Sequence, residues 1–203
     1  PKRTVIVLEG HPQRRHLLLE SYKQGRQSPG DDFWRQQDDI VRILNLMPVE
    51  ILKHPEHEAD DVIAHAVNEM YSQKRCIVIS SDADFIQLLD LSDDRVRLYN
   101  PIKKEFTPAT PYDYVMWKAL VGDGSDCIEG FKGIGPKRAE ALLNEGLGDF
   151  LSDPESRLKF GQNISLLQFE TVIGPKILSD GSGCNWELVR SEFERMEFSS
   201  IIA

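Results

Sequence analysis

The chain has 203 residues, of which 40% are hydrophobic and 28% are charged, a balance typical of soluble globular proteins. This length suffices for one large domain or two small ones, with a core that needs no disulfide or structural metal. No apolar run approaches the ~18–20 residues of a membrane span, so we expect no membrane partner. Three scattered cysteines indicate a reducing, cytoplasmic compartment. The net charge of −9, taken alone, argues against a nucleic-acid partner.

The first half of the chain alternates between predicted strands and helices. Residues 4–8 form a β-branched run that predicts a strand buried on both faces. The polar residues 11–32 predict an excursion with some helix, and residues 33–46 return to helical spacing. A second short strand is expected at residues 49–52, and the acidic residues 57–61 open a helix whose apolar side chains share one face.

The pattern continues and then changes. Residues 76–80 predict another buried strand, residues 85–89 a helix, and residues 96–99 an edge strand. After Thr107 we expect short helices joined by glycine turns, and no strand before the end of the chain. The sequence therefore predicts an α/β fold: a central, mainly parallel sheet with helices on both faces over residues 1–106, and a helical region over residues 107–203.

Acidic residues gather in four groups, most of them at strand ends or helix starts, where a parallel sheet collects its functional side chains. The groups are Glu9; Glu58, Asp60 and Asp61; Asp82 and Asp84; and Asp123 and Asp126. An isolated pair of such carboxylates is usually a helix cap or part of a solvated face. Many carboxylates in one pocket need cations, and oxygen ligands without His or Cys favour Mg²⁺ or Mn²⁺. Two such ions can activate a water molecule and stabilise the leaving oxygen of a phosphodiester.

These groups also change the argument from net charge. The chain has 33 acidic and 24 basic residues, so with the eight grouped carboxylates set aside, 25 acidic residues face 24 basic ones. The remaining surface is almost neutral overall. A local basic patch, and therefore a nucleic-acid partner, is compatible with this composition.

A glycine-rich turn carries the clearest binding motif. Gly133 and Gly135 allow a tight turn with exposed backbone N–H groups, and Pro136 suits the first position of a following helix. Amides at such a helix start attract anions, and three cations accompany them: Lys132, Lys137 and Arg138. The pattern predicts a helix-hairpin-helix that holds a phosphate backbone without reading bases. The alternative is an ordinary glycine turn between two helices.

Together these motifs resemble the 5′-nuclease family, which includes flap endonucleases, bacteriophage 5′–3′ exonucleases and the 5′-nuclease domain of bacterial DNA polymerases. Residues 58–61 match its Glu-Ala-Asp-Asp signature, and residues 81–84 and 122–126 match its later acidic pairs. Residues 131–138 match its helix-hairpin-helix, and residues 22–26 look like the basic motif of its arch, through which a single strand threads. The resemblance covers nearly the whole chain, with the motifs in order.

The resemblance implies a structure-specific 5′–3′ exonuclease or 5′-flap endonuclease that hydrolyses DNA with two Mg²⁺ or Mn²⁺ ions. A PIN-like nuclease core would span residues 1–106, with the arch at about residues 11–32. One ion would be held by Glu9, Glu58 and Asp60, and the other by Asp82, Asp84 and Asp126, with Asp61 and Asp123 in supporting positions.

The same resemblance assigns the DNA contacts. Tyr22, Lys23 and Arg26 would bind DNA in the arch, where Lys23 and Arg26 would contact the scissile or adjacent phosphates. The hairpin would bind the duplex backbone, helped by a K⁺ ion, through Lys132, Gly133, Gly135, Lys137 and Arg138. We expect a monomer that acts on DNA with a 5′ flap or a 5′ end, and also on RNA–DNA hybrids, in association with a DNA polymerase.

The sequence departs from the family pattern at three places. Glu9 stands where the family usually has Asp, and Cys127 replaces a usual Asn. The family also has a preceding strand that carries its first catalytic Asp, and residues 1–3 provide no such strand. A second hypothesis is therefore a structure-specific DNA-binding protein with weakened catalysis. A third, a small PIN-like ribonuclease, is disfavoured because those domains do not usually carry the hairpin.

Overall fold

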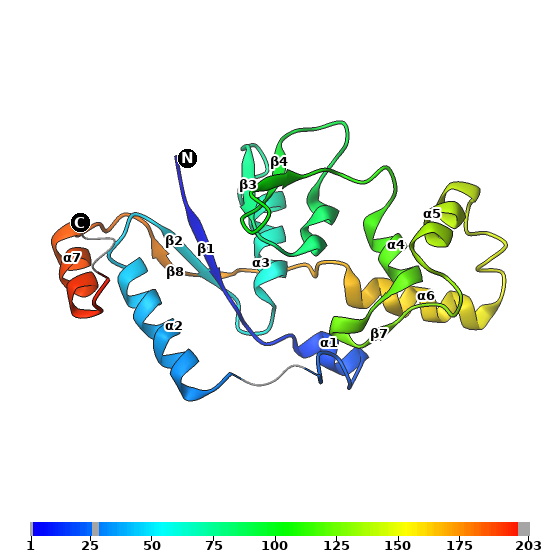
Figure 1. Ribbon diagram of the computed structural model, residues 1–203, viewed down its shortest axis with the longest axis horizontal. Coiled ribbons are helices and arrows are strands. Elements are labelled where there is room, and N and C mark those ends of the chain that lie inside the picture. Colours follow the sequence, from blue (N-terminus) through cyan, green and yellow to red (C-terminus); the bar gives the residue numbers. More distant parts are fainter. Residues whose placement is uncertain (1, 26–28, 199–203) are drawn as a thin grey trace. The chain divides into compact units, whose positions relative to one another are not determined.

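The computed structural model describes residues 2–25 and 29–198 (Figure 1). The chain forms two compact units, each assembled from segments that are distant in sequence. The first comprises Pro1–His11, Gln27–Val62 and Val172–Ala203, and the second comprises Pro12–Arg26 and Ile63–Thr171. The sequence predicts a different division, near residue 106, between a nuclease core and a hairpin region. That division was defined by function, and it stays a prediction.

The first unit is built on a three-stranded mixed sheet. Its strands are β1 (Val5–Leu8), β2 (Glu50–Lys53) and β8 (Lys176–Asp180), in the order β1-β2-β8. β1 and β2 are parallel, whereas β2 and β8 are antiparallel with an irregularity between Ile51 and Leu52. Both of these side chains are fully buried, which makes the central strand the core of this unit.

Two helices of the first unit lie side by side: α2 (Asp31–Leu44) and α7 (Trp186–Arg195). Arg42 of α2 lies 3.2 Å from Glu192, and Arg195 of α7 lies 3.3 Å from Asp39. Ion pairs this exposed contribute little to stability, because solvent screens them, so they define the alignment of the helices more than their stability.

The second unit begins with another three-stranded sheet. It contains β3 (Cys76–Ile79), β4 (Val96–Asn100) and β5 (Glu105–Thr107), with β3 and β4 parallel and β4 and β5 antiparallel. The chain enters β3 through α3 (Ala59–His65) and the π-helical turn η1 (Ala66–Met70), and leaves it through the 3₁₀ helix η2 (Ala83–Leu88). These elements enclose a core of Val67, Val78, Phe85, Val96 and Leu98.

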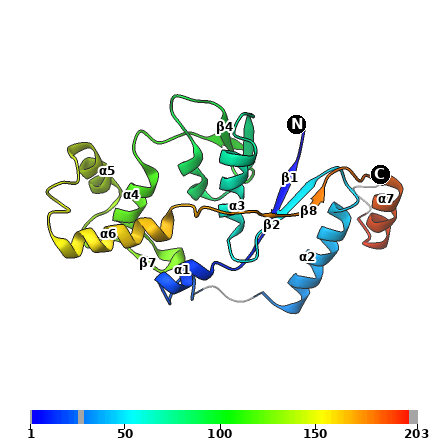
Figure 2. The same cartoon turned by 180° about the vertical axis from the view of Figure 1, so that it is seen from behind.

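A helical region completes the second unit. Its elements are α1 (Gln13–Leu18), α4 (Tyr114–Val121), α5 (Pro136–Glu145) and α6 (Pro154–Leu167), with the short pair β6 (Gly122–Asp123) and β7 (Ile128–Glu129) around η3 (Gly124–Asp126). α4 lies against both α5 and α6 (Figure 2). The buried amide of Asn163 donates 2.9 Å hydrogen bonds to the carbonyl oxygens of Ala119 and Glu129, which ties α6 to α4 and β7.

The structure confirms the α/β class and the presence of strands near residues 4–8, 49–52, 76–80 and 96–99. The prediction of an edge strand at residues 96–99 was wrong, because β4 lies between β3 and β5. The predicted burial was also wrong for two strands, since β1 is only half-buried and β3 exposes Ile77 and Ile79. The prediction of one mainly parallel sheet was wrong, because the described strands form three separate small sheets with mixed pairing. The prediction of no strand after residue 107 was also wrong, since β8 pairs with β2 about 130 residues earlier. None of the helices within residues 2–25 and 29–198 is both long and apolar enough to cross a membrane.

Candidate functional site

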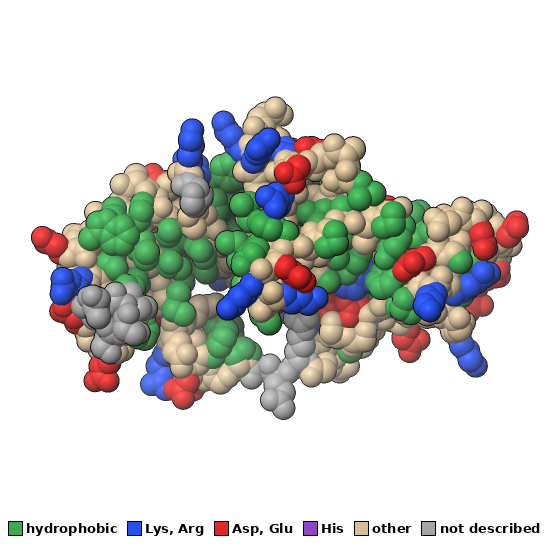
Figure 3. Space-filling view, turned by 45° about the horizontal axis from the view of Figure 1, so that its top comes forward, with side chains coloured by type: hydrophobic (Ala, Val, Ile, Leu, Met, Phe, Trp, Pro, Cys, Tyr) green, Lys and Arg blue, Asp and Glu red, His purple; other side chains and the backbone are tan. Residues whose placement is uncertain are grey.

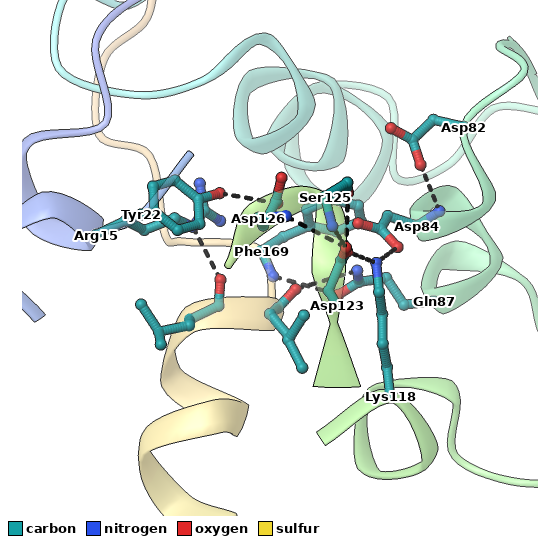
Figure 4. A network of polar contacts seen from close by, with 12 residues as sticks. Arg15, Tyr22, Asp82, Asp84, Gln87, Lys118, Asp123, Ser125, Asp126 and Phe169 are labelled. Carbon is teal, nitrogen blue, oxygen red and sulfur yellow. Dashed lines mark hydrogen bonds and ion pairs between the residues drawn. The ribbon is translucent and has the colours of Figure 1, made fainter. Parts of the chain in front are cut away.

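The second unit brings two predicted site residues to one lysine, with a third close beside them. Asp84 lies in η2, directly after β3, and Asp123 lies in β6. The ammonium of Lys118, from α4, contacts the Asp84 carboxylate and lies 2.6 Å from Asp123 Oδ2 (Figure 4). Asp82 is the N-cap of η2, where its Oδ1 accepts the Asp84 N–H at 2.9 Å. Two carboxylates thus share one cationic side chain, and a third caps the helix that carries one of them.

Their electrostatic coupling is visible in the pKa values. Burial raises the pKa of Asp84, Lys118 opposes this, and the charges of Asp82 and Asp123 add to the rise. Burial acts to raise the pKa of Asp123 too, but hydrogen bonds from Lys118 and Ser125 dominate and lower it to about 2. Burial disfavours the charged form of Lys118, yet its two carboxylate partners outweigh that effect and raise its pKa. The ion pairs therefore favour the charged forms of Asp123 and Lys118, whereas burial is the larger effect on Asp84 and raises its pKa.

Asp126 lies three residues after Asp123, and its carboxylate contacts Tyr22, in the segment that the sequence predicts as the arch. Its backbone N–H donates to Asp123 Oδ1 at 3.3 Å, and its buried carboxylate accepts the Tyr22 hydroxyl at 3.3 Å. Lys23 donates its backbone N–H to the Asp126 carbonyl oxygen at 3.3 Å. Tyr22 is only 3% exposed, so in this conformation it positions a carboxylate and has little surface for the DNA contact that the sequence predicts.

Sequence reasoning missed two residues of this region, Lys118 and Arg15. Arg15 is buried in α1, and its guanidinium donates to the carbonyl oxygens of Leu166 at 3.1 Å and Gln168 at 3.2 Å. These are carbonyls at the end of α6, which a cation stabilises. Arg15 therefore anchors the start of the predicted arch. A buried role is not visible in the sequence, where Arg15 stands in a polar run.

The remaining predicted carboxylates lie in the first unit, at the start of α3. Glu9 follows β1, and its Oε2 accepts the Ala59 N–H at 3.1 Å. Asp61 is fully buried and accepts the Glu58 N–H at 3.2 Å, while Glu58 itself is also buried. Asp60 lies in the first turn of the same helix. The end of β1 and the start of α3 thus bring together Glu9 and residues 58–61, as the sequence predicts for parallel strand ends.

The glycine turn leads directly into α5. Ile134 donates its N–H to the Phe131 carbonyl oxygen at 3.0 Å, and Gly133 has a φ of +82°, which only glycine adopts freely. Gly135 is the N-cap of α5, and Pro136 occupies its first turn. The predicted DNA contacts Lys132, Gly133, Gly135, Lys137 and Arg138 are all exposed. Lys23 is half-buried, and Arg26 lies outside the described residues.

Comparison with known proteins identifies relatives of this chain. Residues 1–117 match the family described as 5′-3′ exonuclease, N-terminal resolvase-like domain. The thermostable DNA polymerase I of Thermus thermophilus is 36% identical over 154 residues, which cover 70% of this chain and 18% of the polymerase. A 5′-3′ exonuclease of Aquifex aeolicus is 32% identical over 157 residues, covering 71% of this chain and 53% of that protein. The chain thus spans about half or less of these relatives.

Solved structures support the same fold. The T5 5′-exonuclease with bound divalent metal ions (zinc) aligns with a TM-score of 0.70 at 22% identity, over 82% of this chain and 74% of that one. A bacteriophage T5 flap endonuclease in a complex with DNA and metal ions aligns equally well, at 20% identity and over the same shares of the two chains. The sequence match over residues 1–117 decides the assignment: the chain belongs to the 5′-3′ exonuclease N-terminal domain family.

Proposed function

We propose that the chain is a metal-dependent nuclease that hydrolyses DNA phosphodiester bonds at a 5′ end or at the base of a 5′ flap. The observation that carries this proposal is the group of Asp84, Asp123 and Lys118, with Asp82 close beside it. Asp84 and Asp123 share the single ammonium of Lys118, and the exposed Asp82 lies beside Asp84, so this group carries an excess of two negative charges. Membership of the 5′-3′ exonuclease family gives this excess charge a chemical purpose.

The donor set fits divalent metal ions. The carboxylates offer only oxygen atoms, which suits Mg²⁺ or Mn²⁺ better than zinc, and a divalent cation would neutralise the excess charge. We assign Asp82, Asp84 and Asp126 to one ion and Glu9, Glu58 and Asp60 to another, with Asp61 and Asp123 in support. Such ions supply a bound water of lowered pKa and stabilise charge on the phosphate oxygens.

Hydrogen bonds within the chain hold several of the proposed metal ligands in place. Asp61 receives the Glu58 N–H and orders the first turn of α3, and Tyr22 fixes one oxygen of Asp126. Because these carboxylates are ordered in advance, less entropy is lost when metal ions and DNA bind. Lys23 follows Tyr22 directly, and we assign its ammonium, with Arg26, to the phosphate next to the cleaved bond, where a cation stabilises developing negative charge.

We assign duplex binding to the turn before α5. Exposed N–H groups at a helix start and flanking cations bind phosphates of any sequence. The exposed Gly133 and Gly135 leave the backbone open, since a Cβ at either position would meet nothing within 4 Å. This arrangement supports the assignment of a helix-hairpin-helix. From the family resemblance we further assign a K⁺ ion to the turn, and we propose that the chain acts as a monomer, beside a DNA polymerase, on DNA with a 5′ flap or a 5′ end and on RNA–DNA hybrids.

The test is cleavage of a 5′-labelled flap substrate in Mg²⁺ under single-turnover conditions. Asp84→Asn and Asp82→Asn should lower the cleavage rate at least 100-fold, while duplex affinity changes less than about threefold, because each removes a charged oxygen without changing side-chain volume. Asp153→Asn is the matched control, since Asp153 caps α6 as Asp82 caps η2 but lies outside the acidic group.

Parental rates in both variants at half-saturating Mg²⁺ would show that these carboxylates are not the site. Tight flap binding by the parent chain without cleavage would instead favour the catalytically weakened DNA-binding protein. Preference for single-stranded RNA over flap DNA would favour the PIN-like ribonuclease.

A further inference from the structure

Lys118 combines burial with two short carboxylate contacts. Its side chain is only 13% exposed, and its ammonium contacts Asp84 and lies 2.6 Å from Asp123. Figure 4 shows the amine between these two carboxylates, with Asp82 on the neighbouring turn of η2. All of these residues belong to the second unit.

This position has two physical consequences. An ammonium removed from water is unfavourable unless it is paired, so both carboxylates are needed to keep Lys118 where it is. Conversely, Asp84 and Asp123 repel each other and Asp82, and Lys118 supplies the positive charge that offsets this repulsion. The amine therefore does for these oxygens part of what a bound metal ion would do.

We propose that Lys118 is a positioning residue that acts as a tethered cation: it holds Asp84 and Asp123 together in the metal-free protein and competes with a divalent ion for their oxygen atoms. The proposal rests on the proposed function, in which the acidic group binds such an ion. It follows that Lys118 sets the Mg²⁺ concentration at which this site fills, and that it reduces how much the fold depends on metal.

Competition between Lys118 and a metal ion predicts opposite changes in metal affinity and in metal-free stability, which a purely structural role of Lys118 does not predict. Removing the charge of Lys118 adds one net negative charge to the acidic group, so a divalent ion should bind more tightly. The same change should destabilise the metal-free protein, because Asp84 and Asp123 then lack their counter-charge. Metal affinity should rise while metal-free stability falls. Loss of packing alone would lower stability equally with and without Mg²⁺.

The experiment compares Lys118→Met, which keeps the length of the side chain, with Lys118→Arg, which keeps its charge. Lys159→Met is the matched control, because Lys159 is a more exposed lysine 4.0 Å from a single carboxylate, Glu129, outside the acidic group. Two measurements are made on the full chain without DNA: the midpoint of thermal unfolding in EDTA and in 10 mM Mg²⁺, and the Mg²⁺ dissociation constant by calorimetry.

For Lys118→Met we expect a lower unfolding midpoint in EDTA, a Mg²⁺-induced increase at least twice that of the parent, and Mg²⁺ affinity about tenfold tighter. Lys118→Arg and Lys159→Met should stay within about twofold of the parental affinity. Equal Mg²⁺-induced increases in the parent and Lys118→Met, or weaker Mg²⁺ binding by Lys118→Met, would overturn the proposal.

Failure of Lys118→Met to fold in EDTA also decides the matter. Folding restored by Mg²⁺ would support the proposal, whereas a protein that stays unfolded in Mg²⁺ would show that Lys118 is structural only. None of these measurements needs cleavage, so an inactive parent would refute the proposed nuclease function while leaving the metal competition separately testable.

Discussion

Asp123 links the acidic group to the pH dependence of stability. Its carboxyl pKa is lowered to about 2 in the folded chain, against about 3.9 for an unfolded Asp. A carboxyl whose pKa is lower in the folded state stabilises the protein above its unfolded pKa, and this contribution disappears as the pH falls through the folded pKa. The stabilising contribution of Asp123 is therefore complete above about pH 5 and is lost between about pH 4 and pH 2.

Asp123→Asn should therefore lower the free energy of unfolding by about 1 kcal/mol at pH 7, a value discounted for solvent screening of a partly exposed pair. The difference from the parent should shrink steadily below pH 4. Urea unfolding at pH 7, 4 and 3 measures it, with Asp153→Asn run in parallel as a capping control. A difference independent of pH would mean that the ion pair with Lys118 contributes nothing.

Cys127 stands where the family resemblance predicts Asn, and substitutions there test what this difference does to stability. Its φ is +60°, in the left-handed region that Asn tolerates better than most residues. The Asn that the family usually has there thus has a backbone reason, beyond any side-chain hydrogen bond. We expect Cys127→Asn to raise the free energy of unfolding by about 0.5 kcal/mol. Cys127→Ser, a polar change without the left-handed preference, should give no such gain in the same denaturant titration.

The site was predictable where its residues form contiguous acidic motifs. Glu9 and residues 58–61 do meet at one strand end and helix start, and Asp84 and Asp123 share Lys118. Lys118 itself escaped prediction because a lone lysine in an apolar helix usually extends to solvent. Its partners are set by the fold, 34 residues away in the case of Asp84. Arg15 escaped for the same reason, and so did the buried position of Tyr22, which the sequence predicts only as a DNA contact, since burial of a polar side chain is decided by tertiary contacts.

At the scale of elements, the end of β1 depends on a close backbone approach. A Cβ at Gly10 would lie 2.0 Å from the His54 carbonyl oxygen and 2.2 Å from that of His57. Contacts this short with backbone require the loop before α3 to move. Only glycine lets the chain after Glu9 pass this loop, so the approach also determines where Glu9 meets α3.

Gly10→Ala should therefore destabilise the chain by at least about 2 kcal/mol, and Mg²⁺ should bind more weakly because Glu9 and residues 58–61 are displaced. Gly161→Ala is the control with the opposite sign. Gly161 lies inside α6 with nothing within 4 Å of its Cβ position, so alanine should stabilise the helix by up to about 1 kcal/mol. Thermal unfolding of both variants gives the comparison, and a Gly10→Ala protein as stable as the parent would contradict the close approach.

The elements themselves differ in how much local sequence reveals. β1, β2, β3 and β4 are apolar or β-branched runs that local sequence identifies as strands, and the structure has all four. Local sequence did not reveal their burial or position: β3 exposes Ile77 and Ile79, and β4 is a central strand where an edge strand was predicted. β8 is different, because Lys176 and Asp180 frame it and most of its side chains are exposed. Its place depends on pairing with β2, a partner remote in sequence. Local propensity carries no information about such pairing, which explains why a mixed sheet was mistaken for a parallel one.

At the scale of the whole molecule, the chain is acidic overall, and the face drawn in Figure 3 shows no large basic patch among the described residues. The net charge is −9, and the face drawn in Figure 3 shows Lys and Arg side chains scattered among Asp and Glu. A chain of this kind should bind DNA through a few local contacts and should lack the strong, unspecific attraction of a basic protein. The turn before α5 is the place where our proposal puts most of those contacts.

The salt dependence of flap binding measures how many phosphates these contacts neutralise. Each lysine that neutralises a duplex phosphate adds about 0.9 to the magnitude of the slope of log affinity against log salt. Lys132→Ala and Lys137→Ala should each reduce that magnitude by about 0.9, whatever the DNA sequence. Arg138→Ala should reduce it less, because Arg138 lies 3.6 Å from Glu145 and already has a partner. Lys74→Ala, an exposed lysine of the same unit outside the turn, should leave the slope unchanged. Equal slopes in all four variants and the parent would place the DNA backbone elsewhere on the protein.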